Sequence, residues 1–181
     1  MFTILILFTY ISAGTFSIVA MDPQTNEWGI AVASKVLDVG YIVPWAQAEV
    51  GAVATQSYAN PYIGPWALEA LSEGKSADEV LKIILEKDTL AEERQFGIVD
   101  RNGNSSAYTG QNCLDWAGHE TAPYVSVQGN ILVGPEVIDT MLAVFKKTDG
   151  TLAERLLAAL EAGDAVGGDK RGKQSAAIMV V

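Results

Sequence analysis

The chain from Thr15 onward opens with short apolar runs of strand length, separated by turn-forming residues. The runs span 15–21, 28–36, 40–44 and 50–57, and the segment 22–27 between the first two is rich in Asp, Pro, Asn and Gln. Apolar runs this short, bounded by turn residues, are typical of buried strands. The sequence therefore predicts four strands, of which the first two can pair as a hairpin.

Helical patterns follow in two pairs. Asn60 before Pro61 resembles an N-cap with proline at the first helical position, which predicts a helix to about residue 71. Ser76 and Glu79 form a capping-box pattern that opens a second helix over 77–87. The second pair covers 135–147 and, after a capping-box pattern from Thr151 to Glu154, a stretch to about 162.

The remaining segments predict a hairpin, one more strand and a final strand. The hairpin spans 95–109 around Arg101-Asn102-Gly103, and the later strands cover 124–128 and 174–181. We expect 113–121 and the Gly-rich segment 163–172 to be loops. Because strands come in runs and helices in pairs, the order disfavours a doubly wound parallel sheet. It favours a single α+β domain over 15–181, with two antiparallel sheets covered by helix pairs.

Composition and charge narrow the function classes. The 181 residues carry a formal net charge of −10 without a basic run, which argues against nucleic-acid binding. With one cysteine, Cys113, and one histidine, His119, the chain can form no internal disulfide and no His-rich metal site. A carboxylate-rich metal site stays open, but the chemistry considered below needs no metal and no organic cofactor.

Residues 1–14 read as a leader. Positions 2–11 are almost wholly apolar, yet too short for a membrane span, which needs about 20 residues. The segment has the apolar region and the small residues of a secretory signal but lacks its basic start. Signal, propeptide, early start codon and membrane tether stay open as interpretations. The compartment, cytoplasmic or secreted, depends on which of them holds.

Thr15 is the first candidate for chemistry. If the chain is cut after Gly14, Thr15 carries a hydroxyl nucleophile and a free α-amine, whose pKa near ~8 suits it as the base for that hydroxyl. Lys35 ends the second predicted strand and would approach Thr15 in a hairpin, where a buried ammonium would steady an oxyanion. The simpler alternatives are an ordinary strand threonine and a solvated lysine.

Amide side chains at strand ends form a second group of candidates. They are Gln56, Asn60, Gln128 and Asn130, which suit substrate recognition or an oxyanion hole, although capping turns and helices is their alternative role. In the Gly-rich loop, Asp169 and Arg171 stand among glycines and cations, and Arg171 could fork onto a substrate carboxylate. The alternative there is an exposed charged turn. His119 suits a substrate contact or a structural role.

Several blocks together resemble one known family. They include Thr-Phe-Ser-Ile-Val-Ala from Thr15, Trp-Gly-Ile-Ala-Val-Ala-Ser-Lys from Trp28, Ser-Val-Gln-Gly-Asn from Ser126 and Gly-Gly-Asp-Lys-Arg-Gly-Lys-Gln from Gly167. These blocks, in collinear order from Thr15 to Val181, make the chain similar to domain-of-unknown-function family 1028, a family of N-terminal-nucleophile-hydrolase-like proteins. The resemblance implies a four-layer αββα sandwich, Thr15 as nucleophile and Lys35 as a site lysine. It also implies a further strand and helix after Val181.

The sequence thus predicts an N-terminal-nucleophile amidohydrolase that cleaves an amide of a small molecule. Thr15, Lys35 and Asn130 are the predicted catalytic residues. The predicted substrate-binding residues are Gln56, Asn60, His119, Gln128, Asp169 and Arg171. The alternative is a non-catalytic protein that uses the same fold to bind a small ligand, and homo-oligomerisation stays open.

Overall fold

A computed structural model describes residues 14–181, so the predicted leader, except for Gly14, lies outside the described residues. The strands of this part are β1 (Thr15–Asp22), β2 (Glu27–Ser34), β3 (Pro44–Gln47), β4 (Gly51–Ser57), β5 (Arg94–Asp100), β6 (Ser105–Thr109), β7 (Gly118–Ala122), β8 (Val125–Asn130) and β9 (Ser175–Val180). The helices are α1 (Val39–Ile42), α2 (Ile63–Ser72), α3 (Ala77–Lys87), α4 (Glu136–Lys147) and α5 (Leu152–Ala165), with a 3₁₀ turn at Ala91–Glu93.

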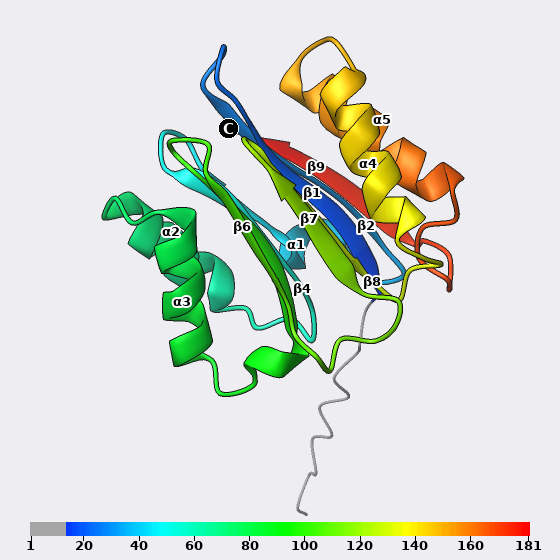
Figure 1. Cartoon of the computed structure of the whole chain (residues 1–181), viewed down its shortest axis with the longest axis horizontal. Coiled ribbons are helices and arrows are strands. Elements are labelled where there is room, and N and C mark those ends of the chain that lie inside the picture. Colours follow the sequence, from blue (N-terminus) through cyan, green and yellow to red (C-terminus); the bar gives the residue numbers. More distant parts are fainter. Residues whose placement is uncertain (1–13) are drawn as a thin grey trace, which may run out of the picture.

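The strands form two antiparallel sheets, as the sequence predicted. One sheet has the order β7-β8-β1-β2-β9 and the other the order β3-β4-β5-β6. The two sheets face each other, α4 and α5 cover the first, and α2 and α3 cover the second (Figure 1). The protein is therefore an α+β fold whose layers run helix, sheet, sheet, helix.

Strand periodicity explains why three separate cores can form. Along β1, Phe16, Ile18 and Ala20 pack under α4 and α5, whereas Val19 and Met21 point to the opposite face. Alternate side chains of a strand point to opposite faces, so each central strand contributes to two layers. The layer between the sheets holds Trp28, Ile30 and other apolar residues at one end of β1. At the other end, near Thr15, the same layer is polar.

Two helix starts were predicted correctly from capping boxes. The Ser76 hydroxyl accepts a hydrogen bond from the backbone N–H of Glu79, whose carboxylate accepts the Ser76 N–H in return. Thr151 and Glu154 make the same reciprocal pair at the start of α5. Each pair satisfies backbone donors that a helix end would leave exposed.

The prediction for the start of α2 was wrong by two residues. The helix begins at Ile63 with Tyr62 as its N-cap residue, and Asn60 does not cap it. Instead, the Asn60 Oδ1 accepts the backbone N–H of Tyr62 at 3.0 Å, and its Nδ2 donates to Asp88 Oδ2 at 2.8 Å. Its amide thus stabilises a turn before the helix and ties that turn to Asp88.

Two further segments differ from the predictions. The strand expected at 40–44 is replaced by the one-turn helix α1 and the short strand β3, which begins at Pro44. The loop expected at 113–121 contains β7 from Gly118 onward. That strand is at the edge of its sheet and half exposed, so it lacks the apolar alternation that would have revealed it.

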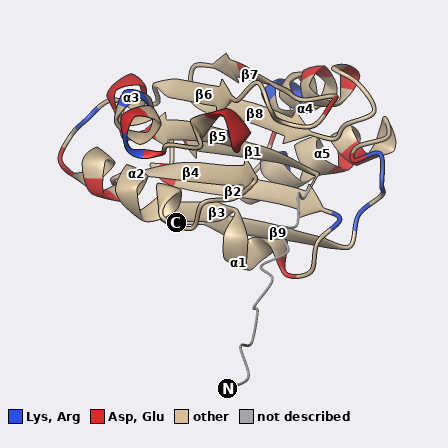
Figure 2. Cartoon of the chain, turned by 90° about the horizontal axis from the view of Figure 1, so that it is seen from below, with Lys and Arg blue, Asp and Glu red and all other residues tan. Residues whose placement is uncertain are grey.

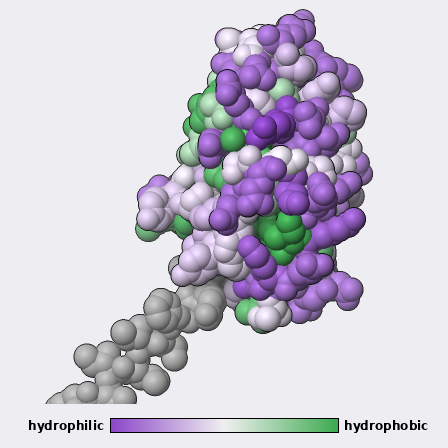
Figure 3. Space-filling model, turned by 90° about the vertical axis from the view of Figure 1, so that its left-hand side faces the viewer, coloured by the Kyte–Doolittle hydropathy of each residue, from purple (hydrophilic) through white to green (hydrophobic). Residues whose placement is uncertain are grey.

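The outside of the molecule is polar. Lys, Arg, Asp and Glu gather on the outer helices and loops, whereas most of each sheet is free of them (Figure 2). The side of the molecule that carries α2 and α3 is largely hydrophilic, with only small hydrophobic areas (Figure 3). In the part of the chain from 14 to 181, no helix is long and apolar enough to cross a membrane.

Candidate functional site

Thr15 is the first residue of a central strand and is almost fully buried. It pairs with Ser34 of β2 on one side and with Asn130 of β8 on the other. Only 1% of Thr15 is exposed, and its alternation with Phe16 places its side chain in the layer between the sheets. The predicted nucleophile therefore faces a closed, polar interior.

Ser34 is the direct neighbour of Thr15, and sequence reasoning missed it. Its Oγ lies 3.0 Å from Thr15 Oγ1 and donates to the carbonyl oxygen of Gly14 at 2.5 Å. The register of the hairpin could have indicated this pairing. The hairpin closes with Asp22 opposite Glu27, and counting back along both strands from that pair aligns Thr15 with Ser34. The prediction had chosen the next residue, Lys35.

The Gly14 carbonyl oxygen also accepts a hydrogen bond from Arg171. Arg171 Nη2 lies 3.0 Å from that oxygen and 2.7 Å from Asp169 Oδ2, while Arg171 Nε lies 3.0 Å from Asp169 Oδ1. The Asp169 side chain is fully buried, so it fixes the guanidinium from behind. The Gly-rich loop thus brings one cation to the Gly14–Thr15 bond, and Asp169 orients it.

A chain of buried side chains continues from this point through the layer between the sheets. We call Thr15, Ser17, Ser34, Gln56, Gln95, Ser126, Gln128 and Asn130 the polar half of that layer. Ser17 Oγ donates to Gln56 Oε1 at 2.6 Å and accepts from Gln128 Nε2 at 2.7 Å. Gln56 Nε2 donates to Gln95 Oε1 at 2.8 Å, and Asn130 Nδ2 donates to the same oxygen at 2.9 Å.

Gln95 joins the two sheets and was also missed. Its Nε2 donates to the backbone oxygen of Gly129 at 2.7 Å and to Thr109 Oγ1 at 2.9 Å. Nothing near Gln95 in the sequence indicates this role, because its partners come from strands far along the chain. Asn130 Oδ1 is buried and has no hydrogen-bond partner in the described part of the chain.

Comparisons with known proteins agree on one family. The model of a family of unknown function, DUF1028, matches residues 15–181. The chain belongs to this family. A crystal structure of protein SPO2555 from Silicibacter pomeroyi, described with the same family model, is similar with a TM-score of 0.87 and 32% sequence identity. The similarity covers 93% of this chain and 76% of that one, and no curated protein matches.

Lys35 of this DUF1028 protein is exposed, not buried as predicted, and it lies just beyond the end of β2. It lines a cavity of about 340 Å³ together with Leu37, Ile42, Ser57 and Gln174. The cavity is at the Thr15 end of the sandwich, since the N–H of Gln174 donates to the Ser34 carbonyl at 2.7 Å. Lys35 therefore contributes its charge to this cavity, and the neighbouring Ser34 is the residue that contacts Thr15.

His119 lies at the outer end of the polar half. Its Nδ1 is 2.8 Å from Thr109 Oγ1, which itself accepts from Gln95. Partial burial of the ring lowers the pKa of His119, although the nearby Glu120 carboxylate acts to raise it. The lowered pKa favours the neutral imidazole, whose Nδ1 can accept a hydrogen bond from the Thr109 hydroxyl.

Asn60 is part of a separate cluster, away from Thr15. Asp88 receives hydrogen bonds from Asn60 and from Arg94, whose Nε lies 2.8 Å from Asp88 Oδ2. Burial acts to raise the pKa of Asp88, but these donors outweigh it and lower that pKa. Within residues 14–181, no group of three or more His, Cys, Asp or Glu side chains is arranged to hold a metal ion.

Proposed function

We propose that this DUF1028 protein is an N-terminal-nucleophile amidohydrolase that becomes active when Thr15 is the first residue of the chain. One observation carries the proposal. The Gly14–Thr15 peptide bond lies at the start of a central strand, with the Gly14 oxygen held by Ser34 and Arg171 and the Thr15 hydroxyl beside Ser34. A hydroxyl, two donors to an adjacent carbonyl oxygen and a rigid strand are the components that acyl transfer needs.

The same donors support removal of residues 1–14. Hydrogen bonds from Ser34 and the Arg171 cation polarise the Gly14 carbonyl and would stabilise negative charge on its oxygen. Attack by Thr15 Oγ1 on the Gly14 carbonyl carbon breaks the C–N bond, and the Thr15 nitrogen takes the hydroxyl proton. Water then hydrolyses the resulting ester, which leaves a Gly14 carboxylate and a free Thr15 amine. A separate peptidase would produce the same terminus.

Turnover then uses the freed amine. With a reference pKa near ~8, the α-amine is mostly protonated at neutral pH, and its free-base form, which accepts the Thr15 Oγ1 proton, predominates only above that pKa. The hydroxyl oxygen attacks the substrate carbonyl, the amine of the substrate leaves with the proton, and water releases the acyl group from Thr15. Asn130 Oδ1, a buried acceptor, suits an N–H of the α-amine.

The surrounding residues divide into those that hold the site and those that meet substrate. The amides of Gln56 and Gln128 are engaged within the polar half, so we assign them to positioning. Once Gly14 has left, Ser34 and Arg171 face the position of its carbonyl. They would then hold a substrate carbonyl or carboxylate oxygen, and Lys35 would contribute charge at the adjacent cavity.

The test combines the mature terminus with turnover. The full-length chain is produced in its native host and its N-terminal residue is identified by mass spectrometry. Hydrolysis is then measured for a panel of small primary and secondary amides, with and without a carboxylate. We expect a terminus at Thr15, and we expect Thr15→Ala to reduce kcat/KM by at least about 10³-fold, as loss of a nucleophile does.

Matched variants separate chemistry from folding. Thr15→Ser keeps the hydroxyl and should retain measurable turnover, and Thr25→Ala, in the exposed β1–β2 turn, should behave as wild type. Full activity of Thr15→Ala, or of a chain that still begins at Met1, would exclude the mechanism. Binding of an amide without turnover, unchanged in Thr15→Ala, would favour the ligand-binding alternative.

A further inference from the structure

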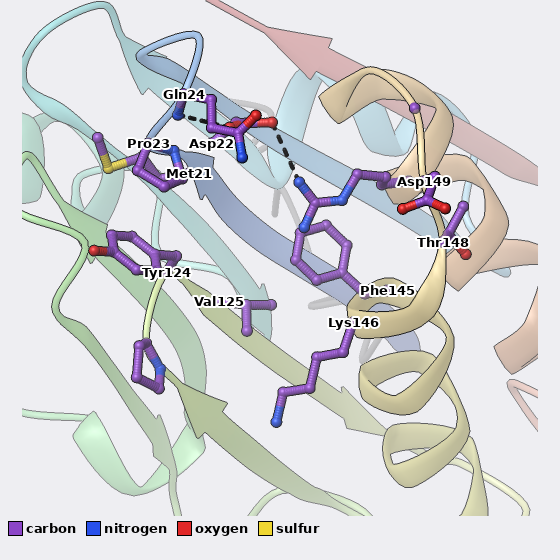
Figure 4. Close-up of a pocket in the computed structure, with 13 residues that line it drawn as sticks. Met21, Asp22, Pro23, Gln24, Tyr124, Val125, Phe145, Lys146, Thr148 and Asp149 are labelled. Carbon is purple, nitrogen blue, oxygen red and sulfur yellow. Dashed lines mark hydrogen bonds and ion pairs between the residues drawn. The ribbon is translucent and has the colours of Figure 1, made fainter.

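A second cavity lies at the other end of β1 and takes no part in the chemistry proposed for Thr15. It has a volume of about 460 Å³ and is lined by residues of the β1–β2 turn, the β7–β8 turn and the α4–α5 connection. β1 is eight residues long, so its two ends lie about 23 Å apart at the usual rise of a strand. Figure 4 shows the side chains around this cavity.

Arg155 of α5 has unused hydrogen-bonding capacity at this cavity. It makes one ion pair, from Nη1 to Asp22 Oδ2 at 3.2 Å, and its Cζ lies 4.4 Å from the centre of the Phe145 ring. The other oxygen of Asp22 accepts the N–H of Gln24, so the usual two-bond fork does not form. Its Nε is buried and has no acceptor among residues 14–181. A buried donor without a partner indicates a place where an acceptor would be favourable.

Lys146 supplies a second cation. It is in the last turn of α4, is exposed, and forms no ion pair with any of the described residues. In Figure 4 its side chain extends from α4 past Phe145, away from Asp22. Lys146 and Arg155 line the same cavity, so a negatively charged group bound there would be attracted by both cations.

The remaining walls limit the kind of anion. Pro23, Pro123 and Tyr124 line the cavity and offer apolar surface to a ligand body. Two carboxylates, Asp22 and Asp149, also line it, and the whole chain carries a net charge of −10. Both would repel a multiply charged anion more than a singly charged one.

We propose that this cavity is a binding site for a small monocarboxylate with an apolar or aromatic body. The carboxylate lies between Arg155 and Lys146, and the body lies against Tyr124 and the two prolines. The site is independent of Thr15, so it stands whether or not the protein is a hydrolase.

The experiment measures the binding of phenylacetate, as the probe, to the full chain by calorimetry and by the shifts of amide NMR signals. We expect phenylacetate to bind at least tenfold more tightly than phenylacetone, a neutral analogue of similar shape. We also expect the largest shifts at Tyr124 and Gly150. Equal affinity for the two compounds, or shifts centred on Ser34 and Lys35, would overturn the proposal, and so would inorganic phosphate binding more tightly than phenylacetate.

Two neighbouring lysines provide a matched control. Lys146→Ala should weaken phenylacetate binding about fivefold to tenfold, in line with the loss of a charged contact. Lys147→Ala removes the same charge from the next residue, which does not line the cavity, and should change affinity by less than about twofold. Both positions are exposed, so neither variant threatens folding. Equal effects of the two variants would reduce the binding to general charge attraction and overturn the site.

Discussion

The layer between the two sheets has an apolar half and a polar half, built from the same strands. Toward the Asp22 end of β1 the sheets meet through Val19, Met21, Trp28 and Ile30. Toward Thr15 they meet through the polar half, whose members are at most 1% exposed. Burying hydroxyls and amides costs free energy unless every group finds a partner, whereas buried apolar side chains stabilise the fold without such a condition.

This difference indicates that the Thr15 end of the layer meets a requirement other than stability. An apolar layer along the whole of β1 would hold the sheets together with fewer requirements. Even Gly97 is fitted to the polar half, because a Cβ at that position would lie 2.1 Å from Gln128 Oε1. The polar half adjoins the Gly14–Thr15 bond, which is what a preorganised site would need.

The largest expected effect is in the apolar half. Ile30→Ala removes a fully buried side chain and should lower the free energy of unfolding by about 3 kcal/mol, within the usual range for such cavities. Ile178→Ala makes the same change on the adjacent strand β9, where the side chain is 41% exposed, and should lose less than about 1 kcal/mol. Urea denaturation measures both. Similar losses would show that the sheets are not held by this half.

The polar half should respond differently to loss of one partner and loss of two. Gln128→Leu leaves the Ser126 hydroxyl without its acceptor and removes a donor to Ser17, so we expect a loss of about 2 kcal/mol. Adding Ser126→Ala removes the stranded hydroxyl and should recover part of that loss, because both partners are then gone.

The double variant with Gln128→Leu and Ser126→Ala also tests whether the polar and apolar halves of the layer have different roles. It should remain impaired in Thr15 chemistry even where stability recovers, while Ile30→Ala should keep its turnover per folded molecule. Gln24→Leu, in the exposed turn after β1, is the control for a change of the same size. If the double variant regains stability and turnover together, the polar half serves packing alone.

Most helices and strands were predicted correctly because the sequence patterns that indicate them involve residues close together in the chain. The capping boxes at Ser76 and Thr151 and the β5–β6 hairpin depend on residues a few positions apart. The errors occurred where context decides. The edge strand β7 has polar residues on both faces. Asn60 does not cap α2, because its Oδ1 accepts the N–H of Tyr62 in the turn before the helix.

The site was less predictable because it depends on which strands face each other. Thr15, Asn130 and Arg171 were singled out from the sequence, and the fold brings them to one end of β1. Gln95 contacts residues 34 and 35 positions away, and no pattern near it indicates that. Ser34 could have been found from the hairpin register, whereas Lys35 was chosen for its charge, a property that says nothing about burial.

The smallest expected effect is at His119, where the polar half reaches the surface. Because its pKa is lowered in the folded protein, the unfolded chain takes up a proton first as the pH falls below about 6.5. Stability contributed by the neutral ring is therefore present above that pH and is lost between it and the lower folded pKa. Because water still reaches much of His119, we expect a loss of well under about 1 kcal/mol. His119→Gln cannot titrate and should show a flatter stability profile from pH 7 to pH 5 in urea denaturation. If the slope is unchanged, protonation of His119 does not affect the hydrogen bonds of Thr109 and Gln95. The hydrogen-bond network of the polar half would then not extend to the surface.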